Sequence, residues 1–353
     1  MRKLASIRKI DSIHPIEGAD NIECAKVGGW SVVVKKGDFE VGELAVHIEI
    51  DSWVPHYVAP FLSKGKTPRE FEGAGPGERL RTITLRGQIS QGLLLDLYSG
   101  CMLDTRIPPK IHPSQFVEGL DVTELLGIVL WTPSLTAQLA GITKGNYPSL
   151  VPKSNQERAQ NLVNEIADAK DKLFEITEKL EGSSMTCYLI GGEFGVCSHN
   201  IDLKETEFNT FWATTRLLNI EGAMRGHFDK YSRITGSDWV IQGELVGPGV
   251  QGNIYKLSKH NFFVYDVYCI DTAEFLKPDV RQELIKQINL SHVPIVAMDK
   301  DLGIGTVDEL LLWAEGKSAL NDKQDREGLV FKACDGDMSF KVVSNKYLLG
   351  ETK

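Results

Sequence analysis

The chain has 353 residues, of which 42% are apolar and 25% are charged, and this composition excludes an intrinsically disordered protein. The length favours two domains, and no apolar run approaches the roughly 18 residues that would indicate a membrane span. The formal net charge of −9 argues against broad, nonspecific binding to a polyanion.

The N-terminal part of the chain contains short apolar runs separated by glycine-rich turns. The segments "WSVVVKKGD", "GELAVHIEID", "LRTITLRGQ" and "SQGLLLDLY" are typical of strands. Short strands at this spacing predict a small OB-type β-barrel over residues 1–130. Residues 64–86 carry six basic and three acidic side chains, which fits either a solvated loop or a local basic groove.

The segment 126–150 has little pattern, and we place a domain boundary near residue 130. A helical period over 154–173, with Ser154 and Glu157 as a capping box, then predicts a helix. Strand-like runs follow, with helices expected at 206–229, 277–288 and 306–315. Strands and helices alternate without a βαβ rhythm, so residues 131–353 are predicted to form an α+β domain built on antiparallel sheets.

Two features of the sequence bear on the cellular environment. The start, "MRKLASIRKIDSIHPIEGAD", lacks the apolar core of a secretory signal. The six cysteines form no C-x-x-C pair and are typical of scattered, reduced thiols. We therefore expect a cytoplasmic protein with neither a zinc site nor a membrane segment.

The segment "GPGVQG" at 247–252 matches the dinucleotide-binding pattern G-x-G-x-x-G. That fold requires a helix directly after the glycines. Here the polar and then strand-like "NIYKLSKHNFFVYDVY" follows. A glycine-rich hairpin is the better interpretation.

A second set of short patterns is spread over the C-terminal half. They are "KLEG" with Lys179, "GVCSHN", "QGELVG" with Glu244, "FFVYDVY" with Tyr265, "EGLVFK" with Glu327, and "SFKVVSNK". Each alone has an ordinary structural explanation, such as a solvated charge or a core aromatic. Their order and spacing carry the functional signal.

This order resembles motifs I, Ia, III, IIIa, IV and V of the covalent nucleotidyltransferase superfamily. Within it the chain resembles ATP-dependent RNA ligases with an N-terminal OB domain, which are RNA repair enzymes. The resemblance implies an ATP-grasp-like nucleotidyltransferase domain over 131–353. It also implies ATP and a divalent metal (Mg or Mn) as cofactors, and RNA ends, possibly in an RNA–DNA hybrid, as the substrate. We expect a monomer.

The resemblance also assigns roles to individual residues. Lys179 is the nucleophile that carries AMP, and Lys341 contacts the α-phosphate. The metal is held by carboxylates, namely Glu181, Glu244 and Glu327. Nucleotide contacts are expected from Glu178, Arg158, Tyr265, Lys332, Glu244 and, from the barrel, Arg86. A lysine with a pKa near 10.4 is a weak nucleophile at neutral pH, and nearby positive charge from the metal and Lys341 is expected to activate it.

The chain departs from the family pattern at three positions. Glu181 stands where motif I normally has Asp, and Tyr265 stands where motif IIIa usually has Phe. The second lysine of motif V is missing or is replaced by Lys346. Alternatives are a DNA ligase, a capping guanylyltransferase, or a non-catalytic nucleic-acid-binding protein. A barrel placed before the transferase domain argues against the first two.

Overall fold

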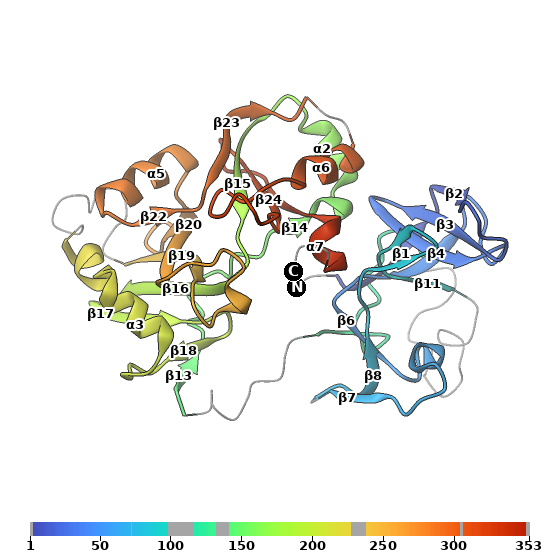
Figure 1. The fold of residues 1–353 in the computed structure, drawn as a ribbon, viewed down its shortest axis with the longest axis horizontal. Helices are drawn as coiled ribbons and strands as arrows, with labels where there is room; N and C mark the ends of the chain where they lie inside the picture. Colours follow the sequence, from blue (N-terminus) through green and yellow to red (C-terminus); the bar gives the residue numbers. More distant parts are fainter. Residues whose placement is uncertain are drawn as a thin grey trace. The chain divides into compact units, whose positions relative to one another are not determined.

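The computed structural model describes residues 3–71, 73–97, 116–131, 141–226, 238–303 and 306–350. The chain divides into two compact units (Figure 1). The first comprises Met1–Ser134 with Gln160–Val163, and the second comprises Leu135–Ala159 with Asn164–Lys353.

Strands are the main secondary structure of the first unit, as predicted. They are β1 (Ala5–Lys9), β2 (Ser12–Pro15), β3 (Ile22–Val27), β4 (Trp30–Lys35), β5 (Leu44–Ile48), β6 (Ser52–Pro55), β7 (Arg69–Phe71), β8 (Gly75–Arg79), β9 (Ile83–Leu85), β10 (Gln88–Ser90), β11 (Leu93–Asp96) and β12 (Val129–Leu130). The 3-10 helix η1 (Pro60–Ser63) lies between β6 and β7. They pair in the orders β1-β5-β11, β2-β3-β4, β12-β6-β8-β7 and β9-β10. All four predicted strand segments are confirmed. In β4 the side chains alternate between buried and half-buried, which is the period-2 pattern of a strand with one face on a core.

The segment 154–173 differs from its prediction. Only α2 (Val163–Asp168) is α-helical, while Glu157–Arg158 form the short strand β14 and Ala159–Asn161 form the 3-10 helix η3. Ser154 was expected to cap this helix, but its Oγ instead donates to Asp266 Oδ2 at 2.9 Å. The predicted helix over 154–162 is therefore wrong.

Residues 160–163 group with the first unit because their polar atoms bond there. Trp30 Nε1 donates to Asn161 Oδ1 at 2.7 Å, and Asn161 Nδ2 donates to Glu49 Oε1 at 2.6 Å. The backbone N–H of Gly29 donates to the Gln160 carbonyl at 3.0 Å.

The second unit is built on two mainly antiparallel sheets, which confirms the predicted α+β class. The larger sheet has the order β13-β18-β17-β16-β19-β20-β21, with β22 also paired to β20, and the smaller has the order β14-β25-β24-β15-β23. The remaining strands are β13 (Thr143–Asn146), β15 (Leu173–Lys179), β16 (Ser183–Ile190), β17 (Glu193–Cys197), β18 (Ile201–Leu203), β19 (Trp239–Val246), β20 (Asn261–Cys269), β21 (Glu274–Phe275), β22 (Ser291–His292), β23 (Ile295–Asp301), β24 (Gly328–Ala333) and β25 (Ser339–Val343). Figure 1 shows β15 and β24 side by side in the smaller sheet.

The helices of this unit are short. They are α3 (Thr210–Leu217), α5 (Pro278–Gln287), α6 (Val307–Ala314) and α7 (Asn345–Leu349), and residues 220–226 are also helical. The helices expected at 277–288 and 306–315 are confirmed, and the Thr306 side chain accepts from the Glu309 N–H at the start of α6. The helix expected at 206–229 begins only after its cap at Asn209, and its last three residues lie outside the described part.

Three phenylalanines form the centre of the smaller sheet's packed face. The rings of Phe331 and Phe340 stack with their centroids 4.8 Å apart, and Phe174 meets Phe340 edge-on at 5.8 Å. All three side chains are fully buried. This packing fixes β15, β24 and β25 together, and it is their opposite face that carries the site described below. The last two residues of "GPGVQG" lie in the 3-10 helix η4 (Gln251–Asn253), and the next element is strand β20, so the dinucleotide pattern is not supported.

A buried histidine in the first unit makes a testable prediction about pH. The ring of His47 lies 5.5 Å from that of Trp30, and burial lowers its pKa to about 4. Because the unfolded histidine has a pKa near 6.5, the unfolded state binds more protons between these values, and stability falls as the pH drops from 6.5 to 4. We expect a loss of up to about 3 kcal/mol in the unfolding free energy from this group.

Urea unfolding across this pH range measures the effect. The pH dependence should be shallower in His47→Gln than in the parent protein. The exposed-residue variant His14→Gln is the control and should follow the parent. Equal slopes in His47→Gln and the parent would contradict the prediction.

Candidate active site

Strand β15 carries Lys179 to one face of the smaller sheet. Side chains two apart in a strand share a face, so Glu175, Thr177 and Lys179 point the same way. Lys179 is paired with Gly328 at the start of β24. A Cβ atom at Gly328 would lie 2.1 Å from the Val342 carbonyl oxygen, and one at Gly182 would lie 2.4 Å from the Leu245 carbonyl oxygen. The glycines of "KLEG" and "EGLVFK" are therefore required by close backbone packing.

A cavity of about 230 Å³ opens beside Lys179. Both sheets of the second unit contribute to it. Six residues that the sequence singled out line it, namely Glu178, Lys179, Glu244, Tyr265, Lys332 and Lys341. Thr177, Ser184, His199, Val293 and Val330 also line it and were not predicted.

The nucleophile candidate is held by an ion pair. Lys179 Nζ lies 2.6 Å from Glu327 Oε1, and the two side chains are 28% and 10% exposed. Burial alone would lower the pKa of Lys179, but the charges of Glu327 and Glu244 raise it, and the net shift is upward. The carboxylates thus favour the ammonium form, Arg158 acts to lower the pKa, and the expected activation by a metal and Lys341 stays a prediction.

The carboxylates around Lys179 suit a hydrated cation. Burial raises the pKa of Glu244 to about 8, and the charge of Glu327 adds to that rise. Two carboxylates that repel each other in a buried site are stabilised by a nearby hard cation. Within the described ranges, no three His, Cys, Asp or Glu side chains form a direct metal-binding group.

Glu181 lies just beyond the strand that ends at Lys179. Its backbone N–H donates to Tyr255 Oη at 2.6 Å, and its side chain shares a hydrogen bond with Tyr347. Burial and the nearby carboxylates raise the pKa of both tyrosines, so they remain neutral hydrogen-bonding groups. The acid at this position thus has one phenolic partner, Tyr347, while Tyr255 holds the backbone.

The lining of the cavity also includes surfaces suited to a flat base. Tyr265 lines it from β20, and its hydroxyl lies 3.2 Å from Ser184 Oγ, which fixes the ring. Val330 of β24 supplies an apolar surface. Glu178 accepts a hydrogen bond from the Ala319 N–H at 2.8 Å, and its own N–H donates to the Pro294 carbonyl, so that N–H is not available to a ligand.

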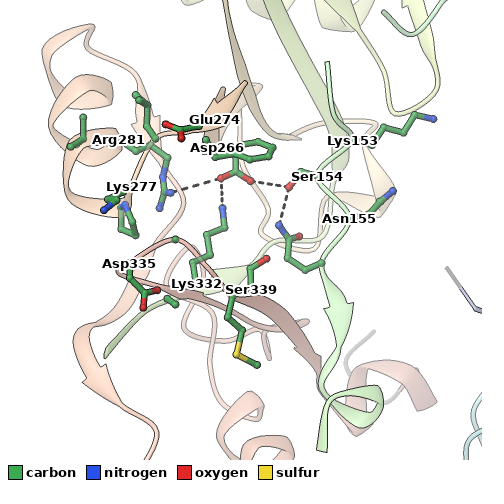
Figure 2. A pocket seen from close by; sticks show the side chains of 18 residues that line it. Lys153, Ser154, Asn155, Asp266, Glu274, Lys277, Arg281, Lys332, Asp335 and Ser339 are labelled. Carbon is green, nitrogen blue, oxygen red and sulfur yellow. Dashed lines mark hydrogen bonds and ion pairs between the residues drawn. The ribbon is translucent and has the colours of Figure 1, made fainter. Parts of the chain in front are cut away.

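Lys332 lines the cavity, and its expected contact with the nucleotide stays a prediction. Its Nζ donates to Asp266 Oδ1 and to the Tyr265 carbonyl, both at 2.6 Å, and the side chain is buried. Figure 2 shows Lys332, Arg281 and Ser154 converging on Asp266. The same Arg281 forms a buried ion pair with Glu175. Lys332 therefore fixes the backbone of Tyr265, the residue expected to stack on the base.

A larger hollow of about 550 Å³, drawn in Figure 2, adjoins this network. It shares Ser154, Asn155, Gln156 and Lys332 with the smaller cavity. Lys332 thus borders both spaces, whereas Asp266 lines only the larger one.

Arg158, Lys346 and Arg86 are the other basic residues that the sequence singled out. Arg158 is 5% exposed and stands in β14, where it pairs in parallel with Lys341 of β25, so it is not on a helix as predicted. Lys346 binds Glu315 at 2.8 Å. Arg86 lies in the turn between β9 and β10 in the first unit, so its expected phosphate contact stays a prediction.

Sequence reasoning missed residues that carry no local pattern. His199 follows Ser198 in "GVCSHN", a motif that we noted without assigning the histidine, and burial beside Lys153 and Lys341 lowers its pKa. Tyr255 comes shortly after the glycines of "GPGVQG", and we interpreted this segment as part of a hairpin. Only its contact with Glu181 reveals its place in the site.

An OB-type unit and a lysine–carboxylate cavity set between two antiparallel sheets define a covalent nucleotidyltransferase. The RNA ligase family model matches residues 172–347, and an OB-fold domain model matches residues 4–97. The chain is similar to the Naegleria gruberi RNA ligase solved with PPi, with 41% identity, a TM-score of 0.86, and coverage of 99% of this chain and 98% of that one. Mutants of that enzyme solved with AMP and Mn and with ATP and Mn give the same identity and TM-score, each covering 98% of both chains. No curated protein matches the chain. The chain belongs to the RNA ligase family.

Removal of the Lys332 ammonium tests its structural role. In Lys332→Met the carboxylate of Asp266 loses its closest cation while it stays buried, so we expect the unfolding free energy to fall by about 3 kcal/mol. Adding Asp266→Asn should restore part of the loss, because it removes the orphaned charge. Denaturant unfolding measures both effects.

The surface variant Lys300→Met is the matched control and should cost less than about 1 kcal/mol. Unchanged stability of Lys332→Met together with a raised KM for ATP would instead assign Lys332 to the phosphates.

Proposed function

We propose that this chain is an ATP-dependent RNA ligase that joins a 3′-hydroxyl to a 5′-phosphate through lysyl-AMP at Lys179. The observation that carries the proposal is the amine of Lys179 held 2.6 Å from Glu327 at the edge of a cavity with an aromatic wall. ATP, AMP and Mn in the structures of the Naegleria gruberi enzyme support the choice of nucleotide and metal.

The reaction has three transfers at phosphorus. The Lys179 amine attacks the α-phosphorus of ATP, a P–N bond forms, and pyrophosphate leaves with the electrons of the P–O bond. The RNA 5′-phosphate then displaces the lysine and takes the AMP. Finally the RNA 3′-hydroxyl attacks that 5′-phosphate, and AMP leaves as the new phosphodiester forms.

The first transfer requires the amine to lose a proton. Because the carboxylates raise the pKa of Lys179, the ammonium form dominates at neutral pH. Glu327 Oε1 accepts a hydrogen bond from Nζ and is placed to hold the proton as the amine is released. Glu244 and Glu327, with Glu181 beside them, would hold a hydrated divalent cation, which supplies positive charge against the α-phosphate and offsets the carboxylates.

Other side chains orient the nucleotide. We assign Tyr265 and Val330 to the two faces of the adenine, and Glu178 to its edge. Lys341 and the neighbouring Arg158 bring two positive charges to the phosphate end. Arg86 of the OB unit is assigned to the β- and γ-phosphates or the RNA backbone, where its planar guanidinium can make paired bonds.

RNA ends are the substrate of this family, and we propose that the chain acts on them as a cytoplasmic monomer, including ends in RNA–DNA hybrids. We place the boundary between the OB and nucleotidyltransferase domains near residue 130. None of the helices in the described part of the chain is long and apolar enough to span a bilayer.

Covalent labelling tests the nucleophile. With ATP labelled at the α-phosphorus and Mn²⁺, the parent protein should acquire one acid-labile AMP, and Lys179→Ala should acquire none. Lys172→Ala is the matched control and should label fully, because that lysine pairs with Asp335 and Asp337 on the surface. Labelling of Lys179→Ala, or labelling of the parent by GTP or NAD⁺ in preference to ATP, would refute the proposal.

The extra methylene of Glu181 makes a separate prediction. Aspartate would be too short to keep the hydrogen bond with Tyr347, so Glu181→Asp should slow lysine adenylylation by about fivefold, the value of one hydrogen bond. In a Tyr347→Phe background the same change should cost less, because the partner is already gone. Single-turnover rates measure both effects, and an equal or faster rate for Glu181→Asp would contradict this account.

A further inference from the structure

A loop in the first unit displays aromatic rings without burying them. Tyr57 is 59% exposed and Phe61 is 58% exposed. They lie four residues apart around the 3-10 helix η1, and no ring contact is found for either among the described residues. Large apolar side chains are normally buried, so two exposed rings in one short loop require a reason.

The backbone beneath these rings is firmly held. Val58 and Ala59 are buried, and Leu62 packs against the core of the first unit. Tyr57 Oη donates to the Leu126 carbonyl at 3.1 Å. The rings are therefore presented on a rigid support, which lowers the entropy lost when a ligand stacks on them.

Two lysines accompany the rings. Lys64 and Lys66 are exposed, and neither has an ion-pair partner among the residues that the structure describes. The Lys64 N–H donates to the Phe61 carbonyl at 3.0 Å, which ties the first lysine to the ring-bearing turn. Lys64 has a φ of +50°, a conformation that glycine adopts at lower cost, yet the position carries a cationic side chain.

The charge of this loop contrasts with that of the whole chain. The chain has 48 acidic residues among 353, about one in seven, but the 17 residues of 52–68 contain none. An acid-free loop with two lysines and two exposed rings matches the chemistry of unpaired nucleic acid, in which phosphates alternate with flat bases.

We propose that Tyr57, Phe61, Lys64 and Lys66 form a docking surface for an unpaired stretch of the RNA substrate. A base stacks on Phe61, with Tyr57 next to it, and the two lysines contact the flanking phosphates. This inference rests on the proposed function, because the loop would give the ligase an RNA-binding surface separate from the nucleotide cavity.

RNA binding without catalysis tests the surface. Fluorescence anisotropy with a labelled, 3′-blocked, single-stranded RNA, measured without ATP, should show Phe61→Ala binding about fivefold or more weakly, the range for one base–aromatic stack. Phe61→Tyr should bind as the parent does, because it keeps the ring. In Lys64→Gln/Lys66→Gln the slope of log K against log salt should fall by about 1.4, as expected for two phosphate contacts on a single strand.

Two further variants separate binding from folding. Lys64→Gly should weaken binding without lowering the urea midpoint, because glycine suits the positive φ. Lys35→Gln/Lys36→Gln removes the same charge from another exposed turn of this unit and should leave the slope close to that of the parent.

The outcomes are distinguishable from failure of the proposed function. Labelling of Lys179 by ATP should be normal in every loop variant, and its absence in the parent would refute the ligase proposal instead. Parent-like RNA binding by Phe61→Ala would overturn the inference. The inference would also be overturned if the parent bound blunt duplex RNA in preference to single-stranded RNA, or if the Lys35/Lys36 control lowered the salt slope equally. The same holds if the loop variants changed only self-association, measured by sedimentation.

Discussion

The contact between Lys179 Nζ and Glu327 Oε1 is the constraint on which the second unit depends. It requires β15 and β24 to be neighbours, and it requires glycine at 182 and 328 so that the flanking backbones can approach. The same contact has a chemical cost, because the carboxylate holds the amine in its protonated form. In the function proposed above, Lys179 becomes nucleophilic when other positive charge enters among the carboxylates.

Much of this arrangement could be predicted from the sequence. The strands are short apolar runs bounded by turn residues, and the order of short motifs led to Lys179, Glu244, Tyr265 and Glu327 through a family resemblance. Their spacing alone would not have placed them together. Ser184 and Val293 could not be found in this way, because a serine in a strand and a valine before a proline have no distinctive pattern. Only sheet pairing brings them to the cavity.

The error in the segment 154–173 has a physical cause. The segment has a helical period but is α-helical only over 163–168, because the hydrogen bonds of Ser154 with Asp266 and of Asn161 with Trp30 and Glu49 outweigh a weak local preference. Strand pairing sets Lys332 opposite Glu175, and the sequence did not indicate its partner, Asp266. In both places a contact distant in sequence sets the local structure.

The pairing of β15 with β24 also has a consequence during synthesis. β15 begins at Leu173 and its partner begins at Gly328, 155 residues later. At about 5–20 residues per second, a ribosome takes roughly 8–30 s to produce that partner. Throughout this interval the nascent strand bearing the future nucleophile has an open edge. Such an edge can pair wrongly with other chains, so the yield of active enzyme should depend on chaperone protection during translation.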